Sequence, residues 1–346
     1  MLLLASLLGL VVAGLAIDLS GSSASDDALG QDDDDDGLSG TGQTVDVAPL
    51  HVVLGEPDPG AIGDTRSSEV ETGGPTPVEP PVDGLTDPPA PQIPVPDGQI
   101  YLGGDGSDYL MGGAGGDSLD GGAGDDDLRG GLGDDTIRAG DGNDWVQGEA
   151  EYGPGGNDEI YGGAGNDLLA GQCGDDLIWG EQGDDTLYGG EGNDTLHGGS
   201  GTDWLSGNDG DDVLISGGGA DDLDGGRGND LLIGDDDPET VWMHGGEGDD
   251  TLMPGAGDFA EGLAGADHFV LRQVDGEVPV IAGYNGVEDQ IFLHLPADIA
   301  VNAEIALQRD QDDTLLITVN GSAIGRLLQD GGLTVEDIVI VPLGQR

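Results

Sequence analysis

Residues 153–197 read GPGGNDEIY-GGAGNDLLA-GQCGDDLIW-GEQGDDTLY-GGEGNDTLH, which is five consecutive units of nine residues. The form that the units share is G-G-x-G-x-D-x-U-x, where U is a large apolar residue, although three of these five units carry another residue at the second position. A period of nine repeated without a gap is typical of a solenoid, in which each unit is one structural step and neighbouring steps stack.

The same period extends well beyond this stretch. Five units run from 103 to 147, a five-residue insertion occupies 148–152, and nine units run from 153 to 233. The spacing then loosens up to residue 270. Because 48 of the 70 glycines lie within 103–270, glycine is a positional residue here, which argues against a featureless flexible linker.

The three residues x-U-x predict a short strand in which only U faces the interior. One apolar residue in nine forms a thin core if each U packs on the U of the next coil. The U positions are Leu110, Leu119, Leu128, Ile137, Val146, Ile160, Leu169, Ile178, Leu187, Leu196, Leu205, Leu214, Leu223, Leu232, Leu252 and Phe269.

The glycines before each strand permit a tight turn that directs carbonyl oxygens inward. The aspartate at the sixth position adds a carboxylate there, and an all-oxygen ligand set suits Ca²⁺ better than Zn²⁺, Cu²⁺ or Mg²⁺. The candidate ligands are Asp108, Asp117, Asp126, Asp135, Asp144, Asp158, Asp167, Asp176, Asp185, Asp194, Asp203, Asp212, Asp221, Asp230, Asp250 and Asp267.

These units resemble the RTX (hemolysin-type) calcium-binding nonapeptide repeat over residues 103–270. The resemblance implies an all-β fold, a right-handed parallel β-roll with two nonapeptides per coil and Ca²⁺ between successive turns. About nine coils spaced by roughly 4.8 Å would make a rod of about 43 Å. Some units depart from the pattern: Ala139 replaces the first glycine, Gln172 and Glu181 replace the second, and one unit carries Ser216 and Ala220.

Residues 265–271 resemble the closing repeat of this family, and residues 281–293 resemble the capping segment of serralysin-type C-terminal domains. That resemblance implies export by a type I secretion system. We expect 271–346 to form a β cap, in which Asn320-Gly321 between two strand-like runs predicts a two-residue hairpin turn.

Two segments precede the roll, which we place at 99–270. Residues 1–17 are an uncharged apolar run that predicts a membrane-targeting role, as an unusual signal peptide, a short anchor or another apolar tail. Residues 18–98 contain 12 of the 18 prolines and acidic runs such as 32–36, so we expect a disordered acidic linker.

The net charge is −63, with 71 acidic residues against eight arginines and no lysine. Nucleic-acid binding is therefore excluded, because it needs a basic surface. The charge also opposes compaction, so we expect the roll to fold only when Ca²⁺ neutralises it outside the cell. Cys173 is the single cysteine, which leaves no intramolecular disulfide.

The chain carries neither H-E-x-x-H nor G-x-S-x-G, so we expect no enzyme, although a hydrolase with an unrecognised site stays an alternative. Trp145, Trp179, Trp204 and Trp242 fall on or near strands, either as surface aromatics that cover the thin sheet or as a stripe that binds glycan or a cell surface. The sequence thus predicts a secreted or surface-tethered bacterial calcium-binding protein, with a calcium-dependent adhesin or surface-layer component as the alternative.

Overall fold

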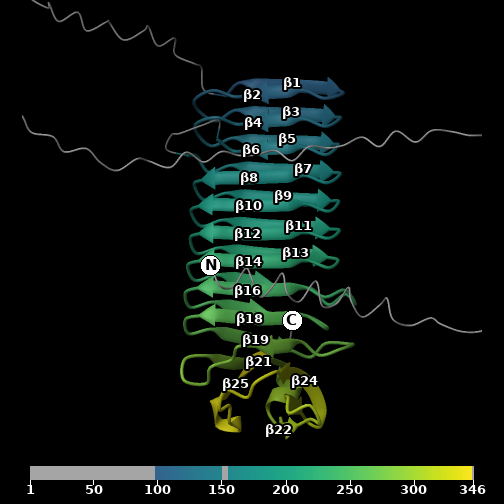
Figure 1. Cartoon of the computed structure of the whole chain (residues 1–346), viewed down its shortest axis with the longest axis vertical. Coiled ribbons are helices and arrows are strands. Elements are labelled where there is room, and N and C mark those ends of the chain that lie inside the picture. Colours follow the sequence, from purple (N-terminus) through teal and green to yellow (C-terminus); the bar gives the residue numbers. More distant parts are fainter. Residues whose placement is uncertain (1–97, 150–154, 345–346) are drawn as a thin grey trace, which may run out of the picture. The chain divides into compact units, whose positions relative to one another are not determined.

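The fold is an all-β coil that alternates between two long sheets. The computed structural model describes residues 98–149 and 155–344. The predicted apolar segment 1–17, the predicted linker 18–98 except its last residue, and part of the insertion lie outside these residues. Successive strands of the chain enter one sheet of 12 strands and one of 13 strands in turn, as Figure 1 shows.

The first sheet consists, in spatial order, of β1 (Ile100–Asp105), β3 (Ser118–Ala123), β5 (Thr136–Asp141), β7 (Glu159–Ala164), β9 (Leu177–Gln182), β11 (Thr195–Ser200), β13 (Val213–Gly218), β15 (Leu231–Ile233), β17 (Thr251–Met253), β19 (His268–Arg272), β21 (Gln290–Pro296) and β25 (Ile338–Leu343). The second consists of β2 (Tyr109–Met111), β4 (Asp127–Arg129), β6 (Trp145–Gln147), β8 (Leu168–Cys173), β10 (Thr186–Glu191), β12 (Trp204–Asp209), β14 (Asp222–Arg227), β16 (Trp242–Glu247), β18 (Phe259–Ala264), β20 (Val280–Ala282), β24 (Ser322–Leu327), β23 (Leu315–Val319) and β22 (Ile305–Arg309). Two short helices, α2 (Ala297–Ala300) and a 3₁₀ turn (Val335–Asp337), lie near the C-terminal end.

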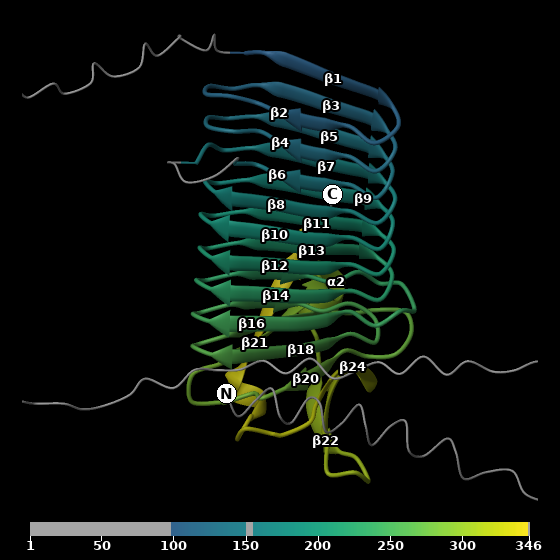
Figure 2. The same cartoon turned by 45° about the horizontal axis from the view of Figure 1, so that its top comes forward.

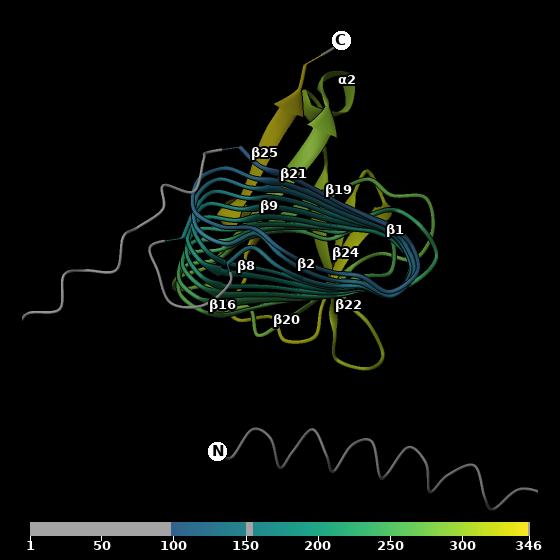
Figure 3. The same ribbon diagram turned by 90° about the horizontal axis from the view of Figure 1, so that it is seen from above.

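The strands of the repeat pair in parallel with a constant offset of 18 residues, or two nonapeptides, in the regular part. Leu187 of β10 lies opposite Leu205 of β12, and Ile178 of β9 lies opposite Leu196 of β11. All predicted U residues except Leu110, which is partly buried, are fully buried. Figure 3, viewed along the stack, shows how the two sheets enclose this narrow core. The predicted parallel β-roll is confirmed.

Most strands are six residues long rather than the three that the repeat predicts. β10, for example, continues from Thr186 through two glycines to Glu191 before the chain turns. The backbone of these glycines therefore belongs to the strand, and the turn begins only after them.

Glycine is required where the turns of neighbouring coils approach each other. Gly192 has a φ of +139°, and a Cβ there would collide with the carbonyl oxygen of Gly174. Gln172 and Glu181, which depart from the repeat, still adopt φ values of 81° and 74°. A left-handed backbone conformation is unfavourable by about 1–2 kcal/mol for a residue with a side chain. Gln172 and Glu181 therefore each reduce the stability of the fold relative to glycine.

The insertion enlarges one turn and leaves the register of the apolar residues intact. Across it the offset grows from 18 to 23, yet Ile137 still pairs with Ile160 and Val146 with Leu169. The insertion therefore leaves the strands on either side of it in register.

Both sheets continue beyond the last nonapeptide at residue 270. β21 and β25 extend the first sheet in parallel, and β20 extends the second. The second sheet ends in the antiparallel strands β24, β23 and β22. The predicted hairpin turn at Asn320-Gly321 joins β23 to β24, and both turn residues have positive φ. Figure 2 shows these strands at the end of the stack opposite β1.

Candidate calcium sites in the turns

Aspartates at the sixth position form two ladders, one in the turns that lead into each sheet. In the first, the backbone N–H of Asp176 donates to Oδ1 of Asp194 at 2.8 Å, and the N–H of Asp194 donates to Asp212 at 2.7 Å. In the second, Asp167 donates to Asp185 in the same way, at 2.8 Å. Each aspartate therefore links its own coil to the coil before it.

The other carboxylate oxygen, Oδ2, is buried without a hydrogen-bond partner in thirteen of these aspartates. They are Asp126, Asp135, Asp144, Asp158, Asp167, Asp176, Asp185, Asp194, Asp203, Asp212, Asp221, Asp230 and Asp250. An ionised oxygen without a partner in the interior is strongly destabilising, so these atoms require a proton or a cation.

The geometry of the turn offers a place for a cation beside each such oxygen. At Gly198, the space that a Cβ would occupy meets both Oδ2 of Asp203 and the carbonyl oxygen of Ser216 in the next coil. A carboxylate oxygen and a carbonyl oxygen thus converge where the absence of a side chain leaves room. This donor set fits the all-oxygen coordination of Ca²⁺.

The electrostatics agree with that need for a cation. Burial raises the pKa of Asp158 to about 8, and the nearby carboxylates of Glu149, Asp176 and Asp135 raise it as well. Burial, followed by the charges of neighbouring aspartates, raises the pKa of Asp194 to about 7. Without a cation, these buried carboxyl groups therefore hold a proton at higher pH than a free aspartate does.

The structure places the predicted ligands together in the two ladders. Fifteen of the sixteen are buried, and Asp108, in the outermost coil, is half-buried. The sequence pattern missed Asp258 and Asp289, which accept hydrogen bonds from the backbone of Val241 and Asp267 and so continue the ladders. Asp258 directly follows a glycine in a unit one residue short, and that Gly-x-Gly-Asp string was the only signal for it.

Glu149, within the insertion, is a further buried carboxylate that the repeat pattern did not indicate. Its Oε1 accepts a hydrogen bond from the N–H of Gly156 at 3.0 Å, and its Oε2 accepts one from the N–H of Cys173 at 3.4 Å. Burial raises the pKa of Glu149 to about 7. This side chain supplies acceptors at the turn that the insertion interrupts.

A second pair of ladders, also absent from the sequence prediction, runs along the outer rim of the turns at the fifth position. The side chain of Asn157 accepts a hydrogen bond from the N–H of Asp175 at 3.1 Å, and that of Asp175 accepts one from Asn193 at 2.9 Å. These residues are exposed, so they stabilise the turns from outside. The recurring Asn-Asp and Asp-Asp pairs were the signal for them.

The tryptophans lie on the outer faces of both sheets. Trp179 on β9 stacks between Tyr161 and His197 of the first sheet, at ring centroid distances of 4.5 and 5.7 Å. Trp145, Trp204 and Trp242 lie on the second sheet and are each more than two-fifths exposed.

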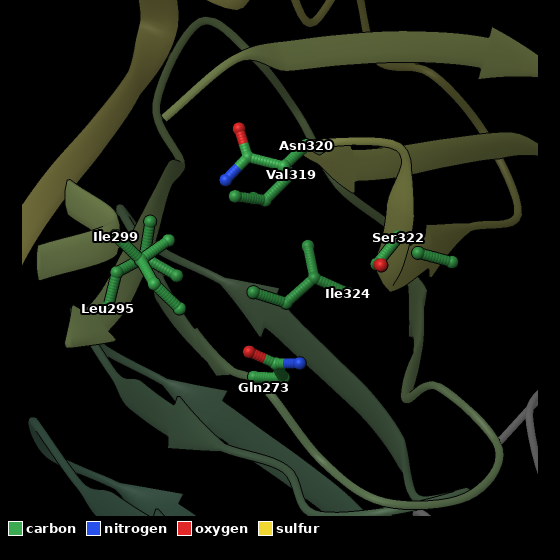
Figure 4. A pocket seen from close by; sticks show the side chains of 8 residues that line it. Gln273, Leu295, Ile299, Val319, Asn320, Ser322 and Ile324 are labelled. Carbon is green, nitrogen blue, oxygen red and sulfur yellow. The ribbon is translucent and has the colours of Figure 1, made fainter. Parts of the chain in front are cut away.

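The other candidate sites offer fewer functional groups than the turns do. Within 98–149 and 155–344, no three His, Cys, Asp or Glu side chains are arranged to hold a metal by themselves, so a cation in the turns also needs backbone carbonyls. A cavity of about 190 Å³ between α2, β21 and the β23–β24 turn, shown in Figure 4, is lined by apolar side chains, Gln273, Asn320 and Ser322, with no titratable group.

Burial raises the pKa of the Cys173 thiol, which makes it less reactive. The described part of the chain contains no helix with the length and apolar character of a membrane span.

Parallel coils joined by glycine-rich turns, with unpartnered carboxylate oxygens facing turn carbonyls, define a calcium-binding β-roll. The model of the RTX calcium-binding nonapeptide repeat (four copies) matches residues 102–137, 129–151, 152–172, 169–196, 197–232 and 241–258. The matched residues make up less than half of the chain, and over them the chain is similar to the RTX calcium-binding nonapeptide repeat.

Two solved structures are also similar to the chain. One is a hyperactive, Ca²⁺-dependent, β-helical antifreeze protein from an Antarctic bacterium, with 25% identity over 58% of this chain and 71% of that one, and a TM-score of 0.30. The other is the extracellular lipase LipA from Serratia marcescens, with 18% identity over 66% of this chain and 40% of that one, and a TM-score of 0.17. A comparison with curated proteins gave no significant match.

Proposed function

We propose that this protein acts outside the cell as a calcium-dependent β-roll, which folds when Ca²⁺ binds its turns and then presents its sheets as a surface. The observation that carries the proposal is the set of thirteen buried Oδ2 atoms without hydrogen-bond partners. When bound, Ca²⁺ would neutralise these carboxylates, and the binding free energy would become folding free energy.

We assign the role of ligand to the sixteen position-six aspartates, and we add Asp258 and Asp289, which occupy the same ladders. The carbonyl oxygens of the turn glycines complete each site. Extracellular modules bind Ca²⁺ with dissociation constants near 10⁻⁴–10⁻³ M, so the chain would stay unfolded at intracellular levels of Ca²⁺.

Circular dichroism during a Ca²⁺ titration tests this function. We expect a spectrum without ordered strands in chelator and a cooperative gain of β-structure below about 10 mM Ca²⁺. Mg²⁺ at the same concentration serves as the control and should give little change, because it prefers rigid octahedral sites that retain water. A spectrum that is the same in chelator and in Ca²⁺ would refute the proposal.

We also propose export by a type I system and a location that is secreted or at the cell surface. An unfolded acidic chain suits passage through a narrow channel, and the resemblance of residues 281–293 to a serralysin-type segment supports this route. Fractionation into released, membrane-held and cytoplasmic pools is the test, and retention of the whole pool in the cytoplasm would contradict the route.

The surface of the roll supports a role in binding, as in an adhesin, better than it supports a role in catalysis. The specific support is the row of exposed rings on the second sheet, since exposed apolar patches mark interaction sites. A cell-adhesion assay with and without Ca²⁺ tests this role, and a broad hydrolase screen of the calcium-loaded protein tests the proposal that it is not an enzyme.

A further inference from the structure

Four aromatic residues stand in one column on the outer face of the second sheet, at the position before U. Their exposed fractions are 58% for Tyr109, 44% for Trp145, 49% for Trp204 and 47% for Trp242. Tyr109 and Trp145 are two strands apart, and so are Trp204 and Trp242. Each pair is therefore separated by about 9.6 Å along the stack.

The first pair of rings encloses a cation that belongs to the chain. Asp127 of β4 lies in register between Tyr109 and Trp145. Arg129, two residues further along β4, places its guanidinium 5.6 Å from the ring centroid of Tyr109 and 5.4 Å from that of Trp145. The same group pairs with Asp127 at 3.1 Å. Two rings and one carboxylate thus form a cage for a guanidinium group.

The second pair repeats this arrangement with one change. Asp222 of β14 lies in register between Trp204 and Trp242, as Asp127 does between the first two rings. The residue that corresponds to Arg129 is Asp224, so no cation of the chain enters from this strand. Among the described residues, the Asp222 carboxylate has no hydrogen bond or ion pair; burial raises its pKa, and the charge of His244 on β16 acts in the opposite direction.

The second arrangement is also open and held in place. A hollow of about 420 Å³ lies at the start of the strands from β10 to β16 and over the turns that lead into them. Trp204, Trp242, Asp222, Thr186 and Thr202 line it, together with the turn residues Asp184, Asp185, Asp203, Ala220 and Asp221. The far side of Trp242 packs on Phe259, with ring centroids 4.7 Å apart. The ring is therefore supported on one side and available on the other.

We propose that the cleft between Trp204 and Trp242 binds the guanidinium group of an arginine side chain from a partner protein. A planar guanidinium pairs with a carboxylate through two N–H donors and stacks on rings, as Arg129 does within this molecule. The chain's charge of −63 attracts basic partners and favours a cation over a neutral ligand. This inference rests on the folded roll but not on which cell surface or partner the protein meets.

The test uses the full chain saturated with Ca²⁺, and N-acetylarginine amide as the probe in a titration monitored by NMR. N-acetylcitrulline amide, similar in shape but uncharged, is the matched control ligand. We expect the arginine probe to bind and the citrulline probe to bind at least about tenfold more weakly. The variant Trp204→Ala should weaken arginine binding by about tenfold, whereas Trp179→Ala on the other sheet should leave it unchanged.

Two further variants test the correspondence between the cages. Asp224→Arg should fill the second cleft from within and abolish binding of the probe, and Arg129→Asp should open the first cage and add a second site. Asp120→Arg, which makes the same change of charge on the first sheet, is the control for Asp224→Arg and should bind as the original chain does.

Circular dichroism in Ca²⁺ first establishes that each variant is folded, so a failure of the roll is distinguished from a failure of the cleft. The proposal is overturned if citrulline binds as tightly as arginine, if a neutral oligosaccharide occupies the cleft while arginine does not, or if Asp224→Arg binds the probe unchanged.

Discussion

At the residue scale, the two carboxylate oxygens of each ladder aspartate differ in their role. Oδ1 accepts a hydrogen bond from the backbone of the preceding coil, and Oδ2 is the oxygen that we propose to bind Ca²⁺. We expect Asp194→Asn to raise the Ca²⁺ concentration at the midpoint of folding several-fold, because the site loses a charged oxygen. Glu191→Gln, an exposed neighbour with the same loss of charge, is the control and should shift the midpoint little. Equal shifts for both variants, measured by circular dichroism, would mean that net charge alone governs folding.

Most of these residues could be predicted from the sequence because the turn fixes the distance from glycine to aspartate. Asp258 and Asp289 could not be predicted in this way. Their place in the ladders depends on hydrogen bonds from the backbone N–H groups of Val241 and Asp267, which only the folded coils bring close. Glu149 could not be predicted for a related reason: its carboxylate reaches the N–H groups of Gly156 and Cys173, which only the folded coil brings together.

At the scale of strands and coils, stability depends on a core one residue wide. We expect Leu196→Ala to destabilise the calcium-loaded roll by about 2–5 kcal/mol, because this fully buried side chain has no other layer to collapse onto. Thr195→Ala, next to it but on the outer face, is the control and should cost under about 1 kcal/mol. Thermal or denaturant unfolding measures both, and similar losses would contradict a one-residue core.

The strands themselves were predicted from the position of U, and their parallel pairing was implied by the resemblance to known repeats. Their full length was not predicted, because glycines such as Gly189 and Gly190 read as turn residues although their backbone still pairs. The extension of both sheets past residue 270 also had no signal in the repeat. Strands β20 and β21 extend the sheets because the last coil of the repeat presents unpaired backbone groups that need partners.

At the scale of the whole molecule, the raised pKa values predict how stability depends on pH. Free aspartates titrate near 3.8, whereas the folded pKa of Asp135 is about 6, that of Asp194 about 7 and that of Asp158 about 8. The folded state thus binds more protons than the unfolded chain in this window. Stability without metal is greatest below about pH 4 and is lost as the pH rises through 6 to 8.

We therefore expect the calcium-free chain, which should lack ordered strands at neutral pH, to gain β-structure and thermal stability as the pH falls from 8 to 5. The Ca²⁺ midpoint should rise over the same range, because protons compete for the ligands. Melting curves in chelator and Ca²⁺ titrations at each pH measure these two trends. A calcium-free stability that falls on acidification would contradict the burial of the carboxyl groups.

The alternation of successive units between two sheets sets a rule for how such a gene can change length. Loss or gain of 18 residues removes or adds one complete coil, and every remaining unit stays in its own sheet. Loss of nine residues instead transfers every later unit to the opposite sheet. If the loss fell between Trp179 and Trp204, then Trp204 and Trp242 would lie on the first sheet with Tyr161 and Trp179, and the two aromatic pairs would no longer share one sheet. Only insertions or deletions of 18 residues, or multiples of 18, therefore preserve the sheet to which each unit of the roll belongs.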